Sequence, residues 1–217
     1  MHFIDAWIAL APLDLARLLL PAAFLLLAVM LPGRGPARMG SLGVALCLPL
    51  QHELEVPARL LAVWVVLWIT IAWQAGRVTS GARRAITTRL AGMEPGTVAI
   101  LLGAALLVLL LAAVGRQNLS LEDTRRVAYG LFLLVLGLLH LMLRRHALRA
   151  AVAFGALGLG LQVLDSMARR SEVGPASPAS GVVLATAIAV ALTVRIAGSR
   201  EGAAGTAWVS DAHDLRD

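Results

Sequence analysis

Long apolar runs recur along the whole chain, and they restrict its fold more than any other feature. They cover residues 15–31, 40–50, 60–75, 97–114, 127–143, 150–167 and 181–194. A helix of roughly 20 apolar residues crosses the hydrocarbon core of a bilayer. Only 15% of the residues are charged, whereas a soluble domain has about 25%. We therefore predict an all-α fold, a polytopic helical membrane protein with six or seven transmembrane helices.

The number of spans depends on the run 40–50, which is short and is followed by the polar stretch 51–55. This segment either crosses the membrane with a polar end or dips in and returns. With seven spans, most of the arginines share one face, which the positive-inside rule makes cytoplasmic. Both counts put the C-terminus in the cytoplasm of a bacterial inner membrane. Seven spans put the N-terminus in the periplasm.

Three regions are expected along the chain. Residues 1–95 hold two or three N-terminal transmembrane helices and a basic cytoplasmic loop. Residues 96–197 hold the C-terminal transmembrane helices, and residues 198–217 form a polar cytoplasmic tail.

The net charge of +6 does not indicate nucleic-acid binding, because the basic residues lie in short loops where they orient a membrane protein. Cys47 is the only cysteine, and the five histidines show no metal-binding spacing. We expect no catalytic residue, no cofactor and no metal.

The span after Arg149 has no acid at mid-depth, which falls about ten residues on, near Gly158. Asp165 lies roughly 24 Å along the helix from Arg149, near the opposite surface. Its spacing to Arg169 favours an interfacial ion pair over the end of a proton wire. His140 lies one turn before the cytoplasmic end of its span. This position favours a ring that reaches water over a proton relay.

Small residues lead into this span and continue along it, at Ala147, Ala151, Gly155, Ala156 and Gly160. Small residues let helix backbones approach closely in membranes, so this pattern predicts contact with another helix. Trp64 and Trp68 share a helix face, which is typical of interface anchors or packing residues.

The hairpin from Tyr129 through His140, the loop residues Arg144, Arg145, Leu148 and Arg149, and the span to Asp165 resemble a known pattern. It is similar to the three-helix K-type subunit of complex I and to the C-type subunit of multisubunit cation/proton antiporters. It also resembles component E of the hydrogenase-4 and formate hydrogenlyase group, which matches best in length, in its extra N-terminal helices and in its polar tail. The resemblance covers residues 127–196.

The resemblance implies a cytoplasmic loop in which Arg144, Arg145 and Arg149 contact a partner or lipid. In that family the second K-like span carries a mid-membrane glutamate that relays protons, and this position falls on Gly158. The following span, 181–194, also has no acid. His140 and Asp165, which lie near the ends of their spans, could then take part in a proton path only at its ends.

These patterns favour a non-catalytic membrane subunit of a complex-I-like or group 4 hydrogenase-like assembly. Its expected partners are antiporter-like and other membrane subunits and the lipid bilayer. Two alternatives stay open: a small stand-alone transporter or channel, and a membrane enzyme that acts on lipid.

Overall fold

The computed structural model describes residues 7–8, 10–30, 35–50, 56–77, 95–117, 119–143, 147–170 and 180–204. These residues form seven α-helices and no strand, which confirms the all-helical prediction. The helices are α2 Pro12–Met30, α3 Gly35–Leu50, α4 Ala58–Arg77, α5 Pro95–Gly115, α6 Leu121–Leu143, α7 Ala147–Arg170 and α8 Ser180–Ala204. Each of the seven apolar runs lies in one of them, apart from the last residue of the first run, which is not among the described residues.

Local sequence explains several helix starts. Pro12 and Pro95 each occupy the first position of a helix, where proline suits the backbone and its missing N–H costs nothing. Pro57 precedes α4, and its carbonyl accepts hydrogen bonds from the amides of Leu60 and Leu61. Ser120 caps α6, because its hydroxyl accepts a hydrogen bond from the Asp123 amide at 3.1 Å and donates one to the Asp123 carboxylate at 2.7 Å.

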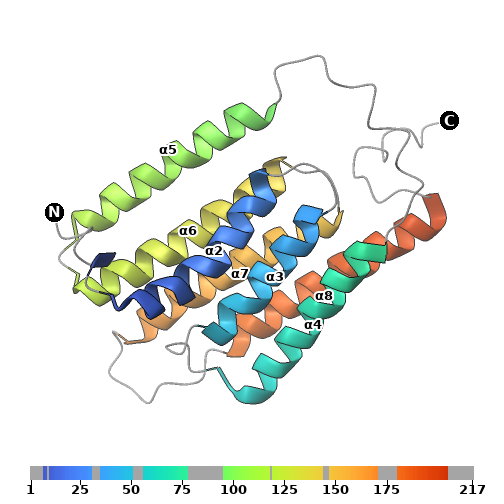
Figure 1. Cartoon of the computed structure of the whole chain (residues 1–217), viewed down its shortest axis with the longest axis horizontal. Coiled ribbons are helices and arrows are strands. Elements are labelled where there is room, and N and C mark those ends of the chain that lie inside the picture. The colour runs from blue at the N-terminus through green and yellow to red at the C-terminus, as the bar shows by residue number, and fades with distance from the viewer. Residues whose placement is uncertain are drawn as a thin grey trace.

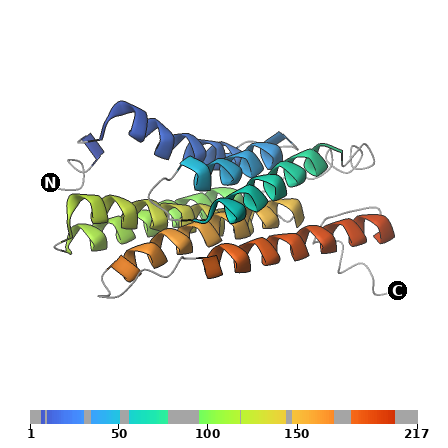
Figure 2. The ribbon, with the colours of Figure 1, turned by 90° about the horizontal axis from the view of Figure 1, so that it is seen from below.

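The helices form two layers of three, with α5 at the edge. One layer holds α2, α3 and α4, the other holds α6, α7 and α8, and within each layer neighbouring helices pack side by side (Figures 1 and 2). Between the layers α2 packs on α6, α3 on α7 and α4 on α8. Successive helices alternate in direction, so that α2 begins at one end of the bundle and α8 ends at the other.

Four helices are long and apolar enough to cross a membrane, over Pro12–Val29, Leu121–Met142, Arg149–Ala168 and Gly181–Ser199. The other three hold shorter apolar stretches among the described residues, at Ala37–Leu50, Ala58–Trp73 and Gly103–Gly115. The chain from Gly35 to Leu50 is one continuous helix and does not turn back on itself. The count of six or seven spans stays a prediction.

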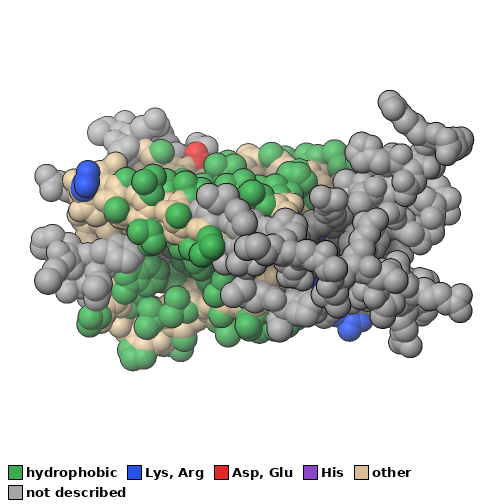
Figure 3. Space-filling model, turned by 90° about the horizontal axis from the view of Figure 1, so that it is seen from above, with side chains coloured by type: hydrophobic (Ala, Val, Ile, Leu, Met, Phe, Trp, Pro, Cys, Tyr) green, Lys and Arg blue, Asp and Glu red, His purple; other side chains and the backbone are tan. Residues whose placement is uncertain are grey.

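Apolar side chains occupy both the interior and the exterior of the bundle. The interior is lined by large buried side chains, among them Leu25, Trp68 and Leu133. Hydrophobic side chains also cover most of the described surface in Figure 3, and those of Val66 and Leu184 are more than half exposed. An apolar surface of this extent is typical of a face that meets lipid or protein and not water.

Candidate functional site

Helix α7, which carries most of the predicted site residues, lies at the centre of the bundle. It packs against α6 and α8 in its own layer and against α3 in the other. Its small residues are buried, at Ala151, Ala153, Gly155, Ala156, Gly158 and Gly160. Because none of them has a bulky side chain, neighbouring helices approach α7 closely from several sides.

Gly158, where the sequence resemblance led us to expect an acid, packs directly on Thr186 of α8. A β-carbon added at Gly158 would lie 2.6 Å from the Thr186 β-carbon and closer still to Thr186 Oγ1 and Cγ2. Thr186 cannot easily move away, because its side chain is short, β-branched and stiff. Its hydroxyl also donates a hydrogen bond to the Val182 carbonyl at 2.7 Å. The contact between α7 and α8 at this level therefore depends on glycine.

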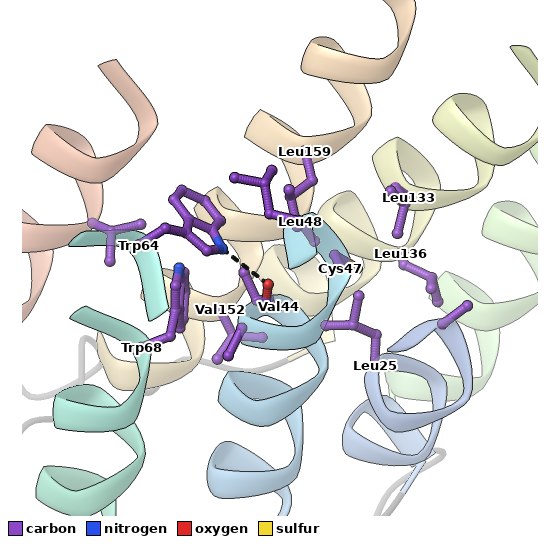
Figure 4. Close-up of a cluster of buried hydrophobic side chains, with 14 of the residues drawn as sticks. Leu25, Val44, Cys47, Leu48, Trp64, Trp68, Leu133, Leu136, Val152 and Leu159 are labelled. Carbon is purple, nitrogen blue, oxygen red and sulfur yellow. Dashed lines mark hydrogen bonds between the residues drawn. The ribbon is translucent and has the colours of Figure 1, made fainter. Parts of the chain in front are cut away.

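The ring of Trp68 from α4 packs against Gly155. Figure 4 shows this ring beside Trp64 and Val44. A β-carbon at Gly155 would lie 2.6 Å from Trp68 Cη2 and 2.9 Å from Val44 Cγ1 of α3. Trp64 is one turn away, with its ring centroid 5.8 Å from that of Trp68. The indole N–H of Trp64 donates to the Val44 carbonyl at 3.1 Å. Both tryptophans are buried, so they pack the junction of α3, α4 and α7 and are not anchors at the surface.

The contact between α6 and α7 brings backbone against backbone. A β-carbon at Gly160 would lie 2.8 Å from the carbonyl oxygen of Gly130, and one at Gly137 would lie 3.0 Å from the carbonyl oxygen of Ala153. The two contacts are seven residues apart on each helix and run in opposite order, which gives an antiparallel register. Because backbone atoms cannot move away as a flexible side chain can, these positions require small residues.

His140 is buried inside the bundle, with 1% of its surface exposed. Its Nε2 lies 3.2 Å from the main-chain oxygen of Leu25 in α2. A carbonyl oxygen only accepts hydrogen bonds, so Nε2 is the donor and carries the proton. The expectation that this ring reaches water was wrong, since the position near the end of α6 is covered by α2. His140 instead joins α6 to α2.

The arginines of the predicted cytoplasmic loop are divided between described and undescribed residues. Arg144 and Arg145 lie outside the described residues. Arg149 is in the first turn of α7 and is 5% exposed, so its side chain is enclosed by the bundle and not spread on the surface. Asp165 is half-buried near the other end of α7. The side chain of Arg169, its expected partner, is outside the described part.

The most buried polar side chain among the described residues of α7, Gln162, was not among the predicted site residues. Gln162 is 1% exposed, and neither its amide nitrogen nor its amide oxygen has a hydrogen-bond partner among the described residues. It was visible in the sequence as the first polar residue of the apolar run 150–167, four residues after Gly158. Cys47 and Tyr129 were also not foreseen as a pair; Cys47 Sγ lies 3.8 Å from the Tyr129 hydroxyl inside the core.

The described residues contain no group of three or more His, Cys, Asp or Glu side chains that could hold a metal ion. Comparisons with models of known families, with curated proteins and with solved structures find no match. The close packing of neighbouring helices on α7 is therefore the structural feature that bears on function.

Proposed function

We propose that the protein is an integral membrane protein of the bacterial inner membrane that crosses the bilayer seven times. At about 1.5 Å per residue, the 20 residues of α4 and the 21 residues of α5 have the length of a span. The 16 residues of α3 are short for one. Its place beside α2, α4 and α7 supports a crossing within the protein interior, where a shorter helix is tolerated.

Within this membrane setting, the protein acts as a non-catalytic packing subunit of a complex-I-like or group 4 hydrogenase-like assembly, beside an antiporter-like subunit. One observation supports this proposal: at Gly158, where the resemblance implies a relay acid, Thr186 fills the space that a side chain would need. A buried acid at this depth is the usual means of moving protons in membranes. Here the same position serves helix packing.

A stand-alone transporter or channel is the second candidate, and the buried polar side chains His140 and Gln162 favour it. Their placement argues against a continuous path. The register of α6 and α7 puts His140 beside the first turn of α7, about 18 Å along the helix from Gln162. The tight contact between Gly158 and Thr186 lies between these two levels.

Affinity purification of the full chain from native membranes in mild detergent, followed by mass spectrometry, tests the proposal. Large membrane partners in stoichiometric amounts, with antiporter-like spans, are the expected result. Recovery of a homo-oligomer alone would overturn the assembly role and favour the transporter.

Proton translocation by the purified assembly gives a second test. Asp165→Asn and His140→Ala are expected to leave translocation intact wherever the assembly still forms. Loss of translocation in an intact assembly would show that one of these side chains is part of the proton path, which the proposal denies.

A further inference from the structure

Gln162 places two polar atoms in the interior of the bundle, and in the part of the chain that the structure describes neither has a hydrogen-bond partner. It lies four residues after Gly158 and seven after Gly155, so it shares their side of α7. Gly155 faces Trp68 of α4, and Gly158 faces Thr186 of α8. The Gln162 carboxamide therefore lies along the seam between α4, α7 and α8.

A buried carboxamide without partners is unfavourable, because folding removes it from water and returns no hydrogen bond. The cost is greater within a bilayer, where lipid offers neither donor nor acceptor. A carboxamide has an N–H donor and a carbonyl acceptor at one point, and water satisfies both at once.

The end of α7 beyond Gln162 carries polar as well as apolar side chains. Ser166 lies one turn further along the same side and is half-buried, as is Asp165 beside it. From Gln162 to the end of the apolar span at Ala168 the distance is about 9 Å along the helix. In the other direction the seam is closed at Gly158, where the α8 side chain leaves no space for even a β-carbon.

We propose that water enters the seam between α4, α7 and α8 from the end where α7 terminates, hydrates the Gln162 carboxamide and is stopped at the contact between Gly158 and Thr186. The chain then holds a dead-end water site that reaches partway into the membrane. This inference rests on the proposed membrane placement but not on membership of any assembly.

Cysteine accessibility in native membrane vesicles tests the site. Cys47→Ala removes the only native thiol. Gln162→Cys or Ala151→Cys then adds a single thiol on one face of α7. Position 162 lies after the Gly158 contact along the helix, and position 151 lies before it. Both native side chains are essentially fully buried, so burial alone predicts equal rates. Methanethiosulfonate ethylammonium reacts with the thiolate, which forms only where water is present. We expect it to modify Gln162→Cys at least tenfold faster than Ala151→Cys.

Equal rates at the two positions would overturn the proposal, whether both thiols react or neither does.

A thermal measurement on the chain with Cys47 intact tests the same site without any introduced cysteine, so it checks that Gln162→Cys did not itself admit water. Gln162→Leu lowers the unfolding midpoint if the carboxamide is hydrated, and raises it if the carboxamide is dry and unpartnered. Leu159→Met, a change of similar size within an apolar environment, is the control and is expected to leave the midpoint nearly unchanged. Neither readout requires a partner, so failure here is distinct from failure of the purification test.

Discussion

Helices α7 and α5 are both long and largely apolar, yet they occupy opposite positions in the bundle. α7 has 24 residues and lies at the centre, while α5 has 21 and packs mainly against α6 at the edge (Figure 1). In the middle of α7, over residues 155–161, glycine and alanine alternate with leucine. That of α5 carries Leu101, Val108 and Leu109, whose side chains are 65–67% exposed.

The difference agrees with a role for side-chain size, beside hydrophobicity, in placing an apolar helix at the centre. In a bilayer, lipid tails are as apolar as leucine, so bulky side chains gain little by turning inward. Small side chains allow backbones to approach and increase van der Waals contact. The absence of an acid from the middle of α7 is thus one consequence of a helix built for close contact on several sides.

The largest expected effect comes from introducing an acid in the middle of α7 with Gly158→Glu. The new side chain would collide with Thr186 and bury a carboxylate, so we expect a loss of unfolding free energy of about 4 kcal/mol or more, from overpacking and charge burial together. Reversible unfolding in mixed micelles measures it. Gly181→Glu is the control: nothing lies within 4 Å of a β-carbon there, and we expect little change. Equal losses of unfolding free energy at Gly158 and Gly181 would show that close packing at the middle of α7 does not decide the effect.

A smaller loss is expected when only a methyl group is added, with Gly155→Ala. Its β-carbon would collide with the rigid ring of Trp68, which costs about 2 kcal/mol of unfolding free energy by overpacking. Trp68→Leu removes the ring, so in a double-mutant cycle the two changes should couple by about 1 kcal/mol or more. Gly198→Ala, at an exposed glycine with open space around it, should be neutral. If the unfolding free energies of the two substitutions were strictly additive, the direct packing of Trp68 on Gly155 would be refuted.

Trp64→Phe should have a moderate effect, because it keeps a ring but loses the hydrogen bond from the indole N–H to the Val44 carbonyl. The expected loss is about 1 kcal/mol of unfolding free energy. Thermal unfolding in detergent compares this variant with Trp73→Phe, whose native side chain is 56% exposed at the outside of α4. A larger loss for Trp73→Phe would contradict the internal role of Trp64.

The smallest effect is expected on α5. Leu109→Ala removes a side chain that meets the surroundings of the bundle, and the change in unfolding free energy should stay within about 0.5 kcal/mol. The same substitution at Leu133, which is fully buried in α6, should cost about 3 kcal/mol. A large loss at Leu109 in the isolated chain would mean that α5 is packed more tightly than its exposure indicates.

The sequence predicts the helices well, because each apolar run is long and is bounded by proline, glycine or charged residues. It does not predict how the helices pair. The i+4 spacing of Ala151 and Gly155 indicates a packed side of α7, but nothing in the pattern names Trp68 as the side chain that fills it. The burial of His140 depends on α2, 115 residues away, and a count of residues from the end of its span cannot reveal such a cover.

The most direct test of the central claim, that Gly158 serves the packing of α7 on α8, is a double-mutant cycle across the contact between the two helices. Gly158→Ala should lower the unfolding free energy by about 2 kcal/mol through overpacking. Thr186→Gly removes the side chain with which the new methyl group collides. If packing is the role of Gly158, the loss caused by Gly158→Ala should be at most half as large when it is measured in the Thr186→Gly background as when it is measured in the native chain. A neutral Gly158→Ala, or a loss that Thr186→Gly does not relieve, would contradict the account.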